Sequence, residues 1–202
     1  MPDKPKILAF AGSLRKDSCN KKLVKIASMS ARNEGFEVNY IDFADYLLPL
    51  YDGDLEEREG LPQPVKELKK LFLDHQGFLI SSPEYNSSIS GTFKNIIDWI
   101  SRPAENEPYY LAPFKGKAAA IMSASPGALG GLRGLVHLRA MLENVSVYVY
   151  PEQMTIPYAY EAFNPEGQLK DQKQQEKVVR FAKDFTHFLA KLEQPIQEKS
   201  LL

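Results

Sequence analysis

The 202-residue sequence has little of what a disulfide, a metal site or a membrane span requires. Its one cysteine, Cys19, cannot close an intrachain disulfide, and its three histidines lie far apart. No His-x-x-x-His or Cys-x-x-Cys pair is present, so we expect no bound metal. No apolar run approaches the roughly 20 residues of a membrane helix, and the N-terminus lacks a signal-peptide pattern. The sequence therefore predicts a cytoplasmic protein without membrane contact.

Neither sign of charge is in excess, because 25 Lys and Arg stand against 26 Asp and Glu, for a formal net charge of −1. A protein that binds nucleic acid needs a surplus of basic residues on one face, so we expect no nucleic-acid partner. Hydrophobic residues make up 44% of the chain, which is enough for a substantial core. The length is typical of one domain, and we predict a single domain over residues 1–202.

Short apolar runs alternate with stretches of helical period along the chain. Because the runs are continuously apolar, they predict a parallel sheet with helices on both faces. Five strand–helix units predict an α/β, flavodoxin-like three-layer sandwich whose five-stranded parallel sheet has the order 2-1-3-4-5. Apolar positions such as Val136 and Leu192 are expected to face the core. The expected strands are 6–11, 36–41, 77–82, 117–123 and 145–150, and the last helix is expected over 171–193.

The loop after the first strand, residues 12–20, has the parts of a phosphate cradle. It offers the hydroxyls of Ser13 and Ser18, the Asn20 amide, the Arg15 guanidinium and the free backbone N–H groups of a helix N-terminus. A helix cap with exposed polar side chains is the alternative interpretation. The loop matches neither Walker A, nor Gly-x-Gly-x-x-Gly, nor the Cys-x5-Arg loop, which argues against P-loop kinases, Rossmann dehydrogenases and cysteine phosphatases.

Two further loops, after the third and fourth strands, are expected at the same edge of the sheet. Pro83-Glu84-Tyr85-Asn86 offers a rigid turn, a flat aromatic ring and amide dipoles suited to a planar heterocycle, although these residue types are common in loops. Gly127, Gly130 and Gly131 permit close approach of either a ligand or the next helix.

Three stretches carry a resemblance to a known family: GSLRKDSCN at 12–20, PEYNSSISGTFKNIIDWISR at 83–102 and SASPGALGGLRG at 123–134. In these stretches the sequence resembles the NADPH-dependent FMN reductase family, a flavodoxin-like group that includes quinone, chromate and azo-dye reductases. The resemblance spans Lys6 to about Tyr150, and the region after Pro151 carries no diagnostic residues.

The resemblance implies an oxidoreductase that passes hydride from NADPH or NADH through N5 of a non-covalent FMN. The acceptors would be free flavin, quinones or similar compounds such as chromate and azo dyes. The family also implies a homodimer or homotetramer with the flavin near a subunit boundary. Because the cofactor supplies the chemistry, no side chain is expected to act as a catalytic group.

The resemblance also assigns cofactor contacts residue by residue. The phosphate would lie on Ser13, Arg15, Ser18, Asn20 and the backbone N–H of Cys19. The ring would lie against Pro83, Glu84, Tyr85 and Asn86, with the backbone around Ala124, Ser125 and Gly127 on another side.

Several residues carry more than one interpretation. Tyr85 and Arg102 would border the acceptor pocket, and Arg102 would alternatively join a subunit contact. Trp99 suits either that contact or the core, and Tyr51 suits the pocket mouth or an exposed loop. We expect Cys19 to be a backbone contact rather than a redox centre, although a helix N-terminus would lower its thiol pKa.

Two other functions stay open at this point. A flavodoxin-like one-electron carrier would be expected to be strongly acidic, whereas this chain is nearly neutral and its ring-facing loop has one carboxylate, Glu84. A flavin-binding regulatory module without turnover is excluded by nothing in the sequence.

Overall fold

The computed structural model describes residues 4–105 and 107–193, and this part of the chain forms an α/β structure. The strands are β1 (Ile7–Ala11), β2 (Val38–Tyr40), β3 (Gly77–Ser81), β4 (Ala118–Ala124) and β5 (Tyr148–Ile156). The helices are α1 (Cys19–Asn33), η1 (Phe43–Asp45, a 3-10 helix), α2 (Gly53–Glu59), α3 (Gln63–Asp74), α4 (Gly91–Ile100), α5 (Leu132–Asn144), α6 (Ala159–Ala162) and α7 (Gln172–Leu192).

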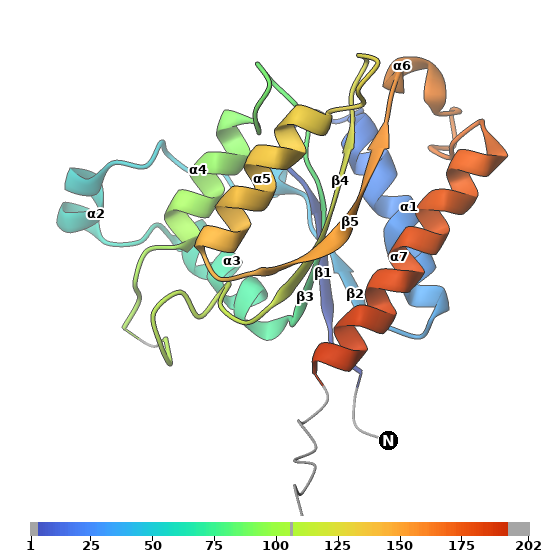
Figure 1. The fold of residues 1–202 in the computed structure, drawn as a ribbon. Helices are drawn as coiled ribbons and strands as arrows, with labels where there is room; N and C mark the ends of the chain where they lie inside the picture. The colour runs from blue at the N-terminus through green and yellow to red at the C-terminus, as the bar shows by residue number, and fades with distance from the viewer. Residues whose placement is uncertain (1–3, 106, 194–202) are drawn as a thin grey trace, which may run out of the picture.

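The sheet has the order β2-β1-β3-β4-β5, and every neighbouring pair is parallel. Helices α1 and α7 cover one face, and α3, α4 and α5 cover the other (Figure 1). The predicted three-layer, flavodoxin-like fold and its strand order are therefore confirmed. Because all strands run the same way, the loops after β1, β3 and β4 reach one edge of the sheet.

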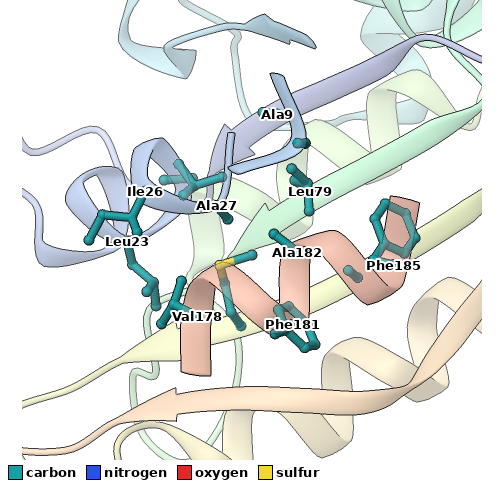
Figure 2. Packing of buried hydrophobic residues seen from close by; sticks show 14 of the residues in the cluster. Ala9, Leu23, Ile26, Ala27, Leu79, Val178, Phe181, Ala182 and Phe185 are labelled. Atoms are coloured by element: carbon teal, nitrogen blue, oxygen red, sulfur yellow. The ribbon is translucent and has the colours of Figure 1, made fainter. Parts of the chain in front are cut away.

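The two faces of the sheet are packed with different side chains. Under α1 and α7, small residues such as Ala9, Ala27 and Ala182 lie among Leu23 and Phe185, so both helices pack close to the strands (Figure 2). Under the other three helices the core is aromatic. The rings of Phe10 and Phe43 have centroids 4.9 Å apart, and those of Phe10 and Phe72 are 5.4 Å apart. Burying each large apolar side chain contributes about 1.5–3 kcal/mol, so both layers stabilise the sheet.

The last strand differs most from its prediction. It begins at Tyr148 and continues through Pro151 to Ile156, whereas the prediction ended it before the proline. Pro151 is tolerated because β5 is an edge strand and its pairing with β4 is irregular between Ala119 and Ile121.

Some apolar positions of α5 and α7 were predicted wrongly to face the core, among them Val136 and Leu192. Val136 is 58% exposed because it lies on the outer side of α5, whereas Leu192 is 37% exposed because it is the last residue of α7. Helices α2 and α6 were not predicted at all; both are short, and α2 begins after Asp52, whose carboxylate accepts a hydrogen bond from the Asp54 N–H at 3.0 Å. No helix within the described residues is long and apolar enough to cross a membrane.

Candidate functional site

The loops after β1, β3 and β4 and the start of α6 enclose a cavity of about 190 Å³ at one edge of the sheet. Ten of the twelve predicted cofactor contacts line it, whereas Asn86 and Gly127 lie in the same loops but outside the lining. The lining residues are Ser13, Arg15, Ser18, Cys19, Asn20, Pro83, Glu84, Tyr85, Ala124, Ser125, Pro126, Ala159 and Tyr160. Two larger hollows of about 560 and 770 Å³ are lined by several lysines. The first borders this cavity at Ser18, but neither is lined by the loops after β3 and β4.

One end of the cavity is formed by the N-terminus of α1. Ser18 is the N-cap residue, yet its side chain makes no capping hydrogen bond although the residue is only 5% exposed. Ser13 is equally buried, and its hydroxyl accepts a hydrogen bond from the Arg15 N–H at 3.3 Å, which turns the loop back toward the helix. The first N–H groups of α1 therefore have no side-chain acceptor, and this arrangement favours a bound anion over the helix-cap alternative.

Asn20 holds the walls of the cavity together. Its Oδ1 accepts from the Ala124 N–H at 2.9 Å and from the Ser81 hydroxyl at 2.8 Å, and its Nδ2 donates to the Ala124 carbonyl at 2.9 Å. These bonds join α1 to β3 and β4, and the side chain is 3% exposed. Only one N–H of Nδ2 is left for the predicted phosphate contact, so the amide acts first as a structural bridge.

The predicted ring-binding loop ends in a tight turn. The backbones of Tyr85 and Ser88 exchange two hydrogen bonds, at 2.9 and 3.0 Å. Between them, Asn86 has φ 52° and Ser87 has φ 62°, so both central residues are left-handed, as a type I′ turn requires. Asn86 therefore provides one of the two left-handed backbone positions of the turn. The turn presents the half-exposed ring of Tyr85 at the cavity.

Glu84 is turned toward α5. Its Oε2 accepts a hydrogen bond from the Gly134 N–H in the first turn of α5 at 2.9 Å. Gly131, the N-cap residue of α5, has φ 92° and no side chain that could cap the helix. A Cβ on Gly134 would lie 3.2 Å from the Ser88 carbonyl oxygen, so glycine permits this close packing. The carboxylate of the ring-facing loop thus caps a helix.

Ser90 links the loop after β1 to the loop after β3. Ser90 is the N-cap residue of α4, and its hydroxyl accepts a hydrogen bond from the Phe93 N–H at 3.2 Å. The same hydroxyl donates to the Gly12 carbonyl at 2.6 Å. A Cβ on Gly12 would lie 2.9 Å from the Phe93 ring, so glycine is required where the loop crosses α4.

The Cys19 thiol is half-buried beside α6, where Sγ donates to the Ala159 carbonyl at 3.5 Å. Burial raises the pKa of this thiol, which reverses the lowering expected from the helix N-terminus. The thiol therefore stays protonated near neutral pH.

The structure does not bring Arg102 or Tyr51 into the lining of this cavity. Arg102 follows the C-terminal end of α4, about 15 Å along the helix from Ser90 at its start. Its Nε lies 2.9 Å from the Glu56 carboxylate, and its guanidinium lies over the Tyr51 ring at 5.4 Å. Trp99 is fully buried and donates to the Pro49 carbonyl at 2.9 Å, so its ring belongs to the core of the protomer.

Three lining residues were missed by sequence reasoning: Pro126, Ala159 and Tyr160. Ala159 donates its backbone N–H to the Ser125 carbonyl at 3.1 Å, which attaches α6 to the loop after β4. For Ala159 and Tyr160 the topology was the signal, because the residues after the fifth strand leave the sheet at the same edge as the other loops.

The cavity combines hydrogen-bond donors at one end with flat, apolar surfaces at the other. The Glu84 carboxylate in its lining accepts a hydrogen bond from the start of α5, and burial raises the pKa of the Cys19 thiol. Among residues 4–105 and 107–193, no group of three His, Cys, Asp or Glu side chains is placed to hold a metal. The fold and the site thus define a flavodoxin-like protein whose cavity suits a phosphorylated, planar cofactor.

Comparison with known proteins narrows this class to a family. The NADPH-dependent FMN reductase family matches residues 5–161. The NAD(P)H-dependent FMN reductase of Pseudomonas aeruginosa is 36% identical over 178 residues, which cover 87% of this chain and 90% of that protein. The quinone reductase of Escherichia coli is 39% identical over 147 residues, covering 70% and 71% of the two chains.

Solved structures agree with the sequence relatives. The flavoenzyme NAD(P)H:(acceptor) oxidoreductase FerB from Paracoccus denitrificans superposes with a TM-score of 0.77 at 31% identity, covering 93% of this chain and 98% of the other. A flavodoxin from the domain Archaea, 12% identical with a TM-score of 0.57, shares the fold alone. The chain belongs to the NADPH-dependent FMN reductase family, which confirms the family and the class of enzyme predicted from the sequence.

Proposed function

We propose that the protein binds FMN non-covalently in this cavity and uses NADPH or NADH to reduce quinones or free flavin, with chromate and azo compounds as further acceptors. The observation that carries the proposal is the joining, in one cavity, of an uncapped helix N-terminus and a loop that presents a flat aromatic ring. The family membership supports the same activity.

The residues at the α1 end fit a phosphate group. Ser13 and Ser18 supply hydroxyls, Arg15 supplies a guanidinium, and the backbone N–H groups of Cys19 and Asn20 open the helix. A phosphate monoester carries about −1.5 to −2 charges at pH 7, and both the helix dipole and Arg15 favour that charge. The uncapped Ser18 hydroxyl leaves this position open for an anion.

The residues at the other end fit a flat heterocycle. Pro83, Tyr85 and the backbone of Ser125 offer planar or apolar surfaces and peptide dipoles. When bound, FMN supplies the capacity to take up and give away hydride. The protein's own residues would hold and orient it: Asn20 keeps the walls at fixed separation, and the turn between Tyr85 and Ser88 fixes the backbone that carries the Tyr85 ring.

The ring end is open to solvent in a single protomer. Tyr85, in the loop assigned to the ring, is 50% exposed although it lines the cavity. We infer that a second copy of the chain covers this side, in a homodimer or homotetramer. Equilibrium sedimentation of the FMN-loaded protein tests this inference, and a monomer at micromolar concentration would overturn it.

The activity is tested by adding NADPH, and separately NADH, to FMN-loaded protein with a benzoquinone as the acceptor. We expect catalytic oxidation of the nicotinamide that needs no second protein. FMN binding without turnover would favour the regulatory module, and turnover only with an added electron-transfer protein would favour the one-electron carrier. Absence of FMN binding would overturn the proposal altogether.

A further inference from the structure

A hollow of about 560 Å³ borders the cavity proposed to hold FMN, at Ser18, and continues along one side of α1. Its residues on α1 recur at spacings of three and four positions, as on one side of a helix. The loop 165–168 and the start of α7 form its other wall. The Ser30 hydroxyl donates to the Val179 carbonyl at 2.7 Å, and this bond joins α1 to α7, which lie side by side in Figure 1.

Four lysines line this hollow, which we call the lysine hollow: Lys16, Lys21, Lys22 and Lys25. Two of them have carboxylate partners. Lys21 Nζ lies 2.6 Å from the Asp42 carboxylate, and Lys22 Nζ lies 2.6 Å from the Asp17 carboxylate. The charges of these two lysines are therefore largely compensated.

The other two lysines have uncompensated charges. Lys16 and Lys25 are exposed and form no ion pair with a carboxylate of the described residues. Lys25 Nζ lies over the Tyr40 ring, 5.0 Å from its centroid, and keeps its positive charge there. Besides Asp17, the lining holds one carboxylate, that of Glu166, so positive charge remains in excess.

The part of the lysine hollow further from the cavity suits a flat and partly apolar group. Along α1, Lys25 lies about 10 Å and Met29 about 16 Å from Ser18. Met29 is 57% exposed and offers apolar surface there, and the Asn33 amide offers a hydrogen-bond donor and an acceptor. The volume lies within the range of about 300–1,000 Å³ that is typical of small-molecule sites. Cationic groups near the cavity are thus followed by a surface that fits a purine.

We propose that the lysine hollow binds the adenosine 2′-phosphate of NADPH, so that the protein prefers NADPH to NADH. The inference rests on the proposed FMN-dependent activity. The nicotinamide has to lie on the flavin ring for hydride transfer, so the adenosine half of the dinucleotide extends away from the ring. The lysine hollow borders the other end of the cavity, at Ser18. NADH carries a hydroxyl where NADPH carries the 2′-phosphate, and a lysine ammonium binds a phosphate as a point charge.

Binding is tested by calorimetric titration of the full-length protein with adenosine 2′,5′-bisphosphate and with 5′-AMP. The two nucleotides differ only by the 2′-phosphate, and saturating FMN keeps both out of the cavity. The variant is the double substitution Lys16→Met and Lys25→Met, which removes the two uncompensated charges. The matched control is Lys66→Met with Lys70→Met, because these exposed lysines line the separate hollow of about 770 Å³ and their loss changes the net charge equally.

We expect wild type to bind the bisphosphate about tenfold more tightly than 5′-AMP, as for two exposed charge pairs. The Lys16→Met, Lys25→Met variant should lose this difference, and the control variant should keep it. Added salt should narrow the difference in wild type, because it screens exposed charges.

Steady-state kinetics of the same FMN-loaded proteins, with a benzoquinone as the acceptor, should show the same selectivity. We expect kcat/KM for NADPH to fall about tenfold in the Lys16→Met, Lys25→Met variant. The value for NADH should stay the same, because NADH has no 2′-phosphate for the two lysines to bind.

Three results would overturn the proposal: equal affinity of wild type for the two nucleotides, an unchanged affinity ratio in the Lys16→Met, Lys25→Met variant, or the same loss in the control variant. An equal fall in kcat/KM for NADPH and NADH would also contradict it. If wild type oxidises neither nicotinamide, the proposed function fails as well. If wild type oxidises both and the variant keeps the wild-type ratio of NADPH to NADH activity, the assignment of the lysine hollow fails alone.

Discussion

The Glu84 carboxylate accepts a hydrogen bond from the Gly134 N–H at 2.9 Å, and this bond joins the ring-facing loop to the first turn of α5. The contact gives a structural role to a carboxylate that also lines the cavity, where sequence reasoning placed it against the flavin ring. It also explains why α5 begins stably after Gly131, which has no side chain to cap the helix.

Replacing this cap should lower stability. Glu84→Ala removes the acceptor and its charge at the positive end of α5, so we expect the free energy of unfolding to fall by about 1–2 kcal/mol. Urea denaturation of the flavin-free protein measures the change. Glu84→Gln retains an acceptor oxygen, so its free energy of unfolding should fall less. A Glu84→Ala variant as stable as wild type would show that the bond does not support the helix.

Asn20→Ala should be the more damaging substitution. It leaves the Ala124 N–H and carbonyl and the Ser81 hydroxyl without their partner in a buried place. Each unsatisfied buried group typically costs about 1–3 kcal/mol, and these costs are not additive, so we expect a loss of about 3 kcal/mol. Asn33→Ala, at the exposed end of the same helix, is the matched control and should change thermal unfolding little. Equal unfolding temperatures for the two variants would contradict the bridging role.

The buried Lys117 should make the free energy of unfolding depend on pH. Burial lowers its pKa from 10.5 to about 8, opposed by Glu193 and Asp74, while Nζ donates to the carbonyls of Leu73, at 3.0 Å, and His75. The folded state therefore releases its proton at a lower pH than the unfolded chain does. Stability should rise with pH between about 8 and 10.5, since the unfolded state binds more protons throughout that window.

The Lys117→Met variant isolates this contribution because methionine does not titrate. From pH 7.5 to 9.5, wild type should gain about 2 kcal/mol relative to the variant in denaturant unfolding. If the stability of wild type relative to Lys117→Met does not increase between these pH values, the lysine titrates normally in the folded protein.

Much of the fold could be predicted because local pattern and topology agree. Continuous apolar strands and amphipathic helices indicate a covered parallel sheet, and the sheet has the predicted order. The end of β5 was missed because proline removes a backbone donor, and only its place at the sheet edge makes Pro151 acceptable. Edge position depends on long-range pairing, which a local pattern does not contain.

The candidate site was predictable where residues lie next to one another in sequence. Ser13, Arg15 and Ser18 lie on one loop, so their convergence follows from the loop itself. Tyr160 joins them from a segment more than a hundred residues away, and its part depends on how α6 packs against Ser125 and Cys19. The hydrogen bond between Glu84 and Gly134 was not predictable, because the two residues are distant in the chain.

The central claim is that the cavity at the N-terminus of α1 holds FMN by its phosphate. The most direct test is the FMN dissociation constant of flavin-free wild type and of Arg15→Ala, with circular dichroism to confirm that the variant is folded. Loss of a charge-assisted hydrogen bond of about 1.5–3 kcal/mol predicts affinity about 10- to 150-fold weaker in the variant. An Arg15→Ala variant that binds FMN as tightly as wild type would contradict the assignment of the phosphate to this loop.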